Sequence, residues 1–231
     1  MHSQDFVFRL SLRGIERHLQ HVPIRAKPIS PSILHSLAAV AASGGFLDRT
    51  CFCAALLLFF LMARAGNVFC DPLNSDIGLR GRDISFFEDH ILVTFRRTKT
   101  IQFGRRRLVL PVFASHSALC VVSACRKMCS SHVGCRSSPF FVRDSLSDAP
   151  LTKRSFLVHI RDMLSRAGVS DPFSFSCHSF RRGGASWAFS VGLPGEFIQI
   201  SGDWASDCYK SYLEVSMETK VHFAKHIANS L

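Results

Sequence analysis

The chain has 231 residues, which suits one large domain, or one domain with a fragment of another. Hydrophobic residues make up 47% of it, enough to build a core, so the composition excludes a disordered or fibrous chain. The excess of 28 Lys and Arg over 17 Asp and Glu gives a formal net charge of +11, which favours a polyanionic partner.

The first part of the chain separates into three segments. Residues 1–22 are amphipathic and predict a helix, and residues 23–32 are rich in proline and read as a linker. A main domain is expected over residues 33–231. It opens with a helix over 33–43, capped by Ser32, and continues after Gly44 and Gly45 with a long helix over 48–68.

The middle of the chain changes its period. Runs of β-branched and aromatic residues at 84–87, 91–95 and 108–113 predict a small antiparallel sheet. Six cations and no acid lie in residues 96–107, which places a basic cluster on the second hairpin. Helices are expected again over 115–130, 153–167, 178–191, 194–200, 207–215 and 220–231. The predicted fold class is therefore mostly α with a small antiparallel β-sheet, α+β.

Two features of the sequence bear on whether the chain crosses a membrane or binds a metal. The most apolar run, 51–63, has thirteen residues between two arginines. A spanning helix needs about 20, so this run predicts a buried core helix and no membrane partner. Nine cysteines, an odd number, fit a reducing compartment better than a disulfide framework. Cys125, Cys129, His132 and Cys135 do not have a standard zinc spacing, and we predict no metal.

The strongest local motif is CHSFRRGGASW at 177–187. His178 and Arg181 are three residues apart, so a helix capped by Ser176 places both on one face. A histidine can move a proton near neutral pH, and an arginine can bind a phosphate with two hydrogen bonds. A helix start also favours an anion. Because H-x-x-R alone is common, ordinary surface polarity is the favoured interpretation of the motif by itself.

The surrounding sequence adds context to this motif. The region 174–215, with HSFRRGG and GDWASDCYKSYL, resembles the catalytic domain of the tyrosine recombinase (phage integrase) family. The sequences of these motifs are most similar to those of the recombinases of DIRS-type and Crypton-type mobile elements. FFLMARAGNVF at 59–69 resembles the family's first-arginine box, and RTKTIQFGRRRLVLPV at 97–112 resembles the hairpin that carries its lysine. The resemblance covers about residues 30 to 225.

The resemblance implies a role for each matching residue. Two arginines bind the scissile phosphate, a lysine protonates the departing 5′ oxygen, a histidine assists proton transfer, a tryptophan packs the site, and a tyrosine forms a covalent 3′-phosphotyrosine. These positions are Arg64 and Arg181, Lys99, His178, Trp204, and Tyr212. The interval from Trp204 to Tyr212 is eight positions, where many family members have nine, so Tyr209 stays open as the nucleophile. Asn67 stands where the family often has an acid.

The same resemblance implies site-specific cleavage and rejoining of double-stranded DNA, with no metal and no other cofactor. It also implies a homotetramer on DNA in a nuclear location, with residues 1–22 as the remnant of an N-terminal helical DNA-binding region. The arginines expected to contact DNA are Arg96, Arg97, Arg105, Arg106, Arg107 and Arg182. Two alternatives remain open: a domesticated or decayed DNA-binding protein that does not cut, and a type IB topoisomerase-like enzyme.

Overall fold

The structure is a computed structural model. It describes residues 11, 14, 26–71, 77–98, 101, 107–131, 134, 136–215 and 217–229. The predicted N-terminal helix over 1–22 lies outside this part of the chain except for residues 11 and 14, so the division into three segments stays a prediction.

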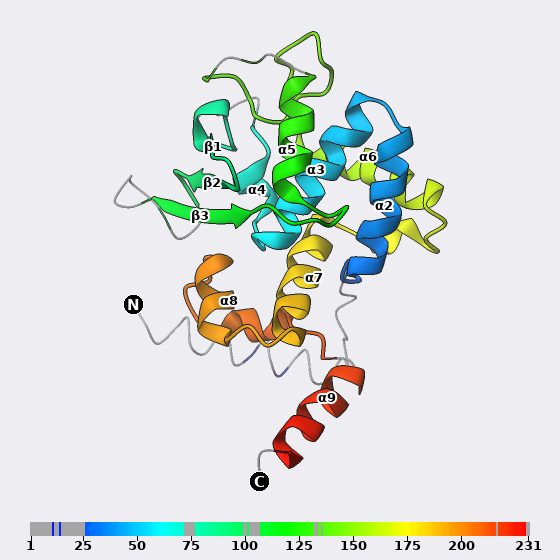
Figure 1. Ribbon diagram of the computed structural model, residues 1–231, viewed down its shortest axis with the longest axis vertical. Coiled ribbons are helices and arrows are strands. Elements are labelled where there is room, and N and C mark those ends of the chain that lie inside the picture. The colour runs from blue at the N-terminus through cyan, green and yellow to red at the C-terminus, as the bar shows by residue number, and fades with distance from the viewer. Residues whose placement is uncertain are drawn as a thin grey trace.

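Helices dominate the described chain, and a three-stranded antiparallel sheet in the order β1-β2-β3 lies to one side of them (Figure 1). The predicted fold class is confirmed. The helices are α2 (Pro31–Ser43), α3 (Phe46–Phe60), α4 (Ala65–Val68), α5 (Val121–Ser130), α6 (Lys153–Arg166), α7 (Cys177–Ser190), α8 (Gly195–Ser201) and α9 (Met217–Ala228). The strands are β1 (Ile84–Phe86), β2 (His90–Phe95) and β3 (Leu108–Phe113), and the 3₁₀ helices are η1 (Gly81–Asp83), η2 (Pro172–Ser174) and η3 (Asp207–Tyr212).

Helix α3 is the centre of the core. It packs against α2, α5, α6 and α7, and its residues from Thr50 to Phe59 are all buried, as the apolar run predicted. The contact with α7 depends on Gly184, where an added Cβ would lie 2.0 Å from the carbonyl oxygen of Phe59. Within the described residues, no helix is both long enough and apolar enough to cross a membrane.

The single helix predicted over 48–68 is wrong. Helix α3 ends at Phe60, and Met62 then adopts a left-handed conformation with φ 48°. The chain turns there, and Arg64 is extended, at the N-cap of the separate helix α4. Arg64 therefore projects from a turn between two helices and does not close the buried helix.

The start of α2 also differs from the prediction. Its cap is Ser30, whose hydroxyl accepts a hydrogen bond from the backbone N–H of Ile33 at 3.2 Å, and Pro31 occupies the first turn, where proline is favoured. Residues 26–30, within the predicted linker, lie extended against α7. Ile29 is buried there, and its N–H donates to the carbonyl of Ser179 at 3.0 Å. Ile29, from the predicted linker, is therefore part of the core.

Other helix boundaries shift by a few residues. Helix α5 begins at Val121, after a turn, and not at 115; the segment predicted as a helix over 207–215 is a 3₁₀ helix that ends at Tyr212; and α9 covers 217–228. Figure 1 shows α9 extending away from the body of the molecule. It touches α7 through the ring of Phe223, which lies 5.6 Å from that of Phe189.

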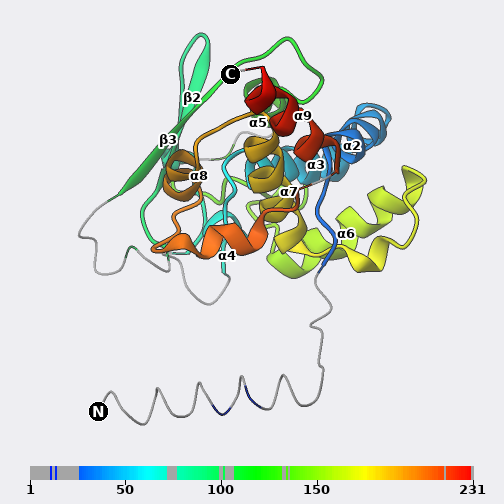
Figure 2. The same cartoon turned by 90° about the horizontal axis from the view of Figure 1, so that it is seen from below.

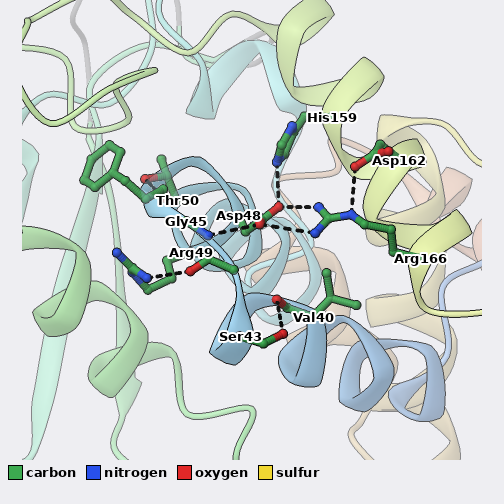
Figure 3. A network of polar contacts seen from close by, with 11 residues as sticks. Val40, Ser43, Gly45, Asp48, Arg49, Thr50, His159, Asp162 and Arg166 are labelled. Carbon is green, nitrogen blue, oxygen red and sulfur yellow. Dashed lines mark hydrogen bonds and ion pairs between the residues drawn. The ribbon is translucent and has the colours of Figure 1, made fainter.

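A buried carboxylate joins the start of α3 to α6 (Figure 3). Asp48 accepts hydrogen bonds from the backbone N–H of Gly45 at 3.2 Å, from Nε2 of His159 at 2.8 Å, and from the guanidinium of Arg166. Burial raises the pKa of Asp48, but the hydrogen bonds from Arg166 and His159 lower it by more, so that its pKa lies below the ordinary value. Arg166 also pairs with the exposed Asp162 at 2.8 Å.

We expect Asp48→Asn to lower the free energy of unfolding by about 1–2 kcal/mol at neutral pH, less than for a fully buried pair because Arg166 is half exposed. A depressed native pKa stabilises the fold above the unfolded pKa of about 3.9, and that contribution is lost as the pH falls through the native value. Urea unfolding at a series of pH values should therefore show a flatter acid limb for the variant. Asp162→Asn, which removes an exposed pair with the same arginine, is the control and should cost less than about 0.5 kcal/mol.

Candidate active site

A cleft of about 430 Å³ lies between α4, the end of β2, α6 and the start of α7. Its walls carry a concentration of basic groups, and the described residues that line it include no carboxylate. The basic lining residues are Arg64, Arg97, Lys153, His178 and Arg181. The cleft is therefore suited to an anion.

Arg181 is only 2% exposed, although it carries a charge. One guanidinium nitrogen donates to the carbonyl of Met62, and Cζ lies 3.6 Å from the centre of the Trp204 ring and 5.6 Å from that of Tyr212. Burial, with the nearby charge of Arg64, lowers the pKa of Arg181 to about 10. The side chain of Tyr212 acts in the opposite direction and raises this pKa. Nε and Nη2 have no hydrogen-bond partner within the described chain. Buried donors of this kind are costly, which marks them as binding groups for an acceptor.

Arg64 approaches the same cleft from the turn before α4. Its Nη1 lies 3.3 Å from the carbonyl oxygen of Asp203 and 3.5 Å from the Oδ2 atom of that residue. The side chain is 26% exposed, so it is held on one side and open on the other. The structure thus brings Arg64 and Arg181, which are far apart in the sequence, to one cleft.

His178 lies at the start of α7, where Ser176 caps the helix as predicted. It lines the basic cleft and also a second hollow of about 410 Å³, which Tyr212 lines as well. Burial lowers the pKa of His178 below its ordinary value, and the charges of Lys153, Arg181 and Arg64 lower it further. The imidazole is therefore neutral near pH 7 and can accept a proton.

The two tyrosines of η3 both meet Trp204, with ring centres 5.3 Å away for Tyr212 and 6.2 Å for Tyr209. Tyr209 is buried, and its hydroxyl points to α8, where a Cβ on Gly195 would lie 2.2 Å from that oxygen. Tyr212 is half-buried, and its ring faces Arg181. Figure 2 shows α7 in the middle of the molecule, with η3 packed beside it. Of the two tyrosines, Tyr212 is the one beside the arginine.

Helix α7 also holds the segment that follows Tyr212. The hydroxyl of Ser186 donates to the carbonyl of Tyr212 at 3.2 Å and accepts from the N–H of Glu214 at 2.8 Å. Arg182 pairs with the carboxylate of Glu214 and donates to the carbonyl of Ala26 at 2.6 Å. Arg182 is thus buried in a contact that joins residues 26–30 to the tyrosine segment, and its expected contact with DNA stays a prediction.

The predicted DNA-contacting arginines of the hairpin have different surroundings. Arg96 makes two hydrogen bonds to the buried carboxylate of Asp83, at 2.8 and 3.1 Å, and so stabilises the protein itself. Arg97 and Arg107 are exposed, whereas Lys99, Arg105 and Arg106 lie outside the described residues.

The cysteine cluster considered for zinc is only partly described, because His132 and Cys135 lie outside the described ranges. In the part that is described, Cys125 lies in the core with its Sγ 3.3 Å from that of Cys53. No group of three or more potential metal ligands occurs among the described His, Cys, Asp and Glu residues.

Two residues of the cleft region were not found by sequence analysis. Lys153, at the start of α6, lines the cleft, but nothing in its local sequence distinguishes it from other surface lysines. Asp203 contacts Arg64, and its only signal in the sequence is its place next to Trp204.

No protein-family model matches the sequence, and no curated protein sequence matches it. Solved structures are similar to it in fold. They include XerA recombinase (TM-score 0.63, 16% identity, 89% of this chain and 65% of that one) and XerH site-specific recombinase bound to difH substrate in a pre-cleavage complex (0.59, 10%, 87% and 54%). A lambda integrase dimer bound to a COC′ core site is another (0.55, 15%, 84% and 49%).

The chain therefore has the tyrosine recombinase catalytic-domain fold. It spans about half to two thirds of the length of these structures' chains.

The electrostatics of the cleft can be tested at His178. We expect Lys153→Met to raise the pKa of His178, because it removes a neighbouring positive charge that disfavours the imidazolium. NMR titration of the histidine ring protons measures this, with the His178 signal assigned from a His178→Gln spectrum. Lys127→Met, a change on α5 away from the cleft, should leave that pKa unaltered. An unchanged pKa in Lys153→Met would contradict the proposed closeness of the two charges.

Proposed function

We propose that this chain is the catalytic domain of a DNA breaking and rejoining enzyme of the tyrosine recombinase type, and that Tyr212 is its nucleophile. The observation that carries the proposal is the buried guanidinium of Arg181, which lies over the Trp204 ring and beside Tyr212 with two unpartnered donors, in a cleft it shares with Arg64. A planar fork of donors matches the oxygens of a phosphodiester. A tyrosine beside it is a nucleophile within reach of the bound phosphate.

In the proposed reaction the Tyr212 oxygen attacks phosphorus, and the bond from phosphorus to the 5′ oxygen breaks. His178, neutral near pH 7, accepts the proton of the tyrosine hydroxyl. Lys99 donates a proton to the departing 5′ oxygen. The two arginines stabilise the negative charge that grows on the phosphoryl oxygens in the transition state. The product is a 3′-phosphotyrosine that keeps the energy of the broken bond, so that rejoining is the reverse of the same steps.

Trp204 has a clear physical part in this scheme. It covers one face of the Arg181 guanidinium at 3.6 Å, an arrangement in which the ring stabilises the cation and fixes its plane. The fixed plane sets the direction in which the free donors of Arg181 point. The role proposed for Trp204 is therefore to orient the arginine.

The broader parts of the proposal follow from the fold and the charge. Double-stranded DNA is the proposed substrate, and binding should depend strongly on salt, because the chain carries a net charge of +11. The similar structures include a lambda integrase tetramer bound to a Holliday junction, which supports a homotetramer on DNA as the working assembly here. The same proposal includes an origin in a DIRS-type or Crypton-type mobile element and a nuclear location. Both rest on the resemblance of the sequence motifs.

A nicked suicide substrate tests the nucleophile. When cleavage occurs next to a nick, the short 5′-hydroxyl fragment diffuses away and the covalent adduct accumulates. A pool of nicked duplexes of random sequence serves as the probe, and the DNA bound to denatured protein is sequenced. We expect adducts with the wild type and Tyr209→Phe and none with Tyr212→Phe, because only Tyr212 lies beside Arg181.

Other outcomes select other functions. Adducts that persist in Tyr212→Phe and vanish in Tyr209→Phe would reassign the nucleophile to Tyr209. Salt-dependent DNA binding without any adduct would favour a binding protein that does not cut. Relaxation of supercoiled plasmid with no preferred sequence would favour a type IB topoisomerase.

The role of Arg181 gives a second prediction. Arg181→Lys keeps a positive charge but loses the planar fork and the flat contact with Trp204. We expect the rate of adduct formation to fall about 10²–10³-fold, as when one transition-state donor is removed. Single-turnover kinetics measure the rate, and circular dichroism checks the fold. A rate within about threefold of the wild type would show that bidentate phosphate binding by Arg181 is not needed.

A further inference from the structure

Asp203 is a buried acid that joins two separate parts of the cleft. Its Oδ2 accepts a hydrogen bond from the hydroxyl of Thr98 at 2.6 Å and lies 3.5 Å from Nη1 of Arg64. Its backbone carbonyl lies 3.3 Å from the same arginine nitrogen. One residue thus contacts the end of the β2 segment and the turn before α4, which are more than 30 positions apart in the sequence.

Thr98 is joined to Ile101 by two hydrogen bonds. Its N–H donates to the carbonyl of Ile101 at 3.1 Å, and its hydroxyl oxygen accepts from the N–H of Ile101 at 3.0 Å. The next residue along the chain after Thr98 is Lys99. Because the Thr98 hydroxyl donates to Asp203 while it accepts from Ile101, the carboxylate fixes the hydroxyl that binds the N–H of Ile101.

The segment that carries Asp203 is itself firmly placed. Asp203 has a left-handed backbone, with φ 54°, and its N–H donates to the carbonyl of Ile200 at the end of α8 at 3.0 Å. The N–H of Trp204 donates to the carbonyl of Gln199, also at 3.0 Å. Trp204 stacks on Arg181, so two adjacent residues of one turn hold the two arginines of the cleft.

We propose that Asp203 is a positioning residue that sets Arg64 and Thr98, the residue before Lys99 in the sequence, relative to each other. The proposal rests on the function proposed above, in which Arg64 binds the phosphate and Lys99 protonates the 5′ oxygen. A single carboxylate then aligns the group that stabilises the attacked phosphate with the group that serves its leaving atom. Asn67, in α4, has no charge with which to do this, and Asp203 provides the negative group beside Arg64.

The first test needs no cleavage. Amide hydrogen exchange in the full chain, followed by NMR, reports the bond from Ile101 N–H to the Thr98 hydroxyl. Asp203→Ala should speed the exchange of Ile101 about tenfold or more, since it frees that hydroxyl, and Asp203→Asn, which can still accept from Thr98, should change it less. Thr98→Val removes the acceptor and sets the upper limit. Asp207→Ala, an exposed acid on η3 paired with Lys210, is the control and should have no effect.

The second test separates the two contacts. The variants are compared on the DNA recovered from the suicide-substrate pool and on the same DNA with sulfur in place of the bridging 5′ oxygen, a leaving group that needs no acid. Thr98→Val should cleave ordinary DNA about tenfold more slowly and recover fully on the sulfur substrate. Asp203→Ala should lose about 100-fold and recover only in part, because its effect through Arg64 remains.

The outcomes are distinct. Asp203→Ala with unchanged Ile101 exchange, or with equal losses on the two substrates, overturns the positioning role. A wild type that forms no adduct refutes the proposed enzyme, while the exchange measurement still decides whether Asp203 stabilises the contact of Thr98 with Ile101. If Asp203→Ala does not fold, the pair Asp203→Asn and Thr98→Val gives the same comparison.

Discussion

The guanidinium of Arg181 is buried beside the central helix, where a charged group needs a neutral oxygen and an aromatic face to compensate for lost water. Both come from places where a helix stops. The oxygen belongs to Met62, which is left-handed because α3 has ended, and the ring belongs to Trp204, in the turn that follows α8. The interruption of α3 is therefore as much a part of the cleft as the arginine itself, since the same turn directs Arg64 to the opening.

Positive charges outnumber negative ones around the cleft. Arg64, Arg181 and Lys153 all lower the pKa of His178, and Arg64 also lowers the pKa of Arg181, because these groups lie close together around a space whose described lining has no carboxylate. Asp203 compensates part of this charge from one side. An anion in the cleft would relieve the remaining repulsion, so the arrangement that makes the free site costly is the one that suits it to an anion.

Patterns local in the sequence predicted local structure well. The apolar run predicted a buried helix, and Ser176 and the H-x-x-R spacing predicted the start of α7. The end of α3 could not be predicted, since apolar residues continue through Ala63 with no Gly or Pro to mark the break. The ion pairs of Arg96 with Asp83 and of Arg182 with Glu214 were missed for a related reason. A run of cations in the sequence indicates a solvent-facing patch, because the acids that pair with them are distant in the sequence.

The interval between Trp204 and Tyr212 ends in η3, a 3₁₀ helix. A 3₁₀ helix rises about 2.0 Å per residue against about 1.5 Å in an α-helix, so its six residues gain roughly 3 Å, about the reach of one extra residue. In such a helix residues i and i+3 lie on the same side, which is why Tyr209 and Tyr212 both contact Trp204. They differ by one turn along the axis, and that displacement directs Tyr209 to α8 and Tyr212 to Arg181. The helix type thus gives the two tyrosines different neighbours, a distinction that the sequence alone did not make.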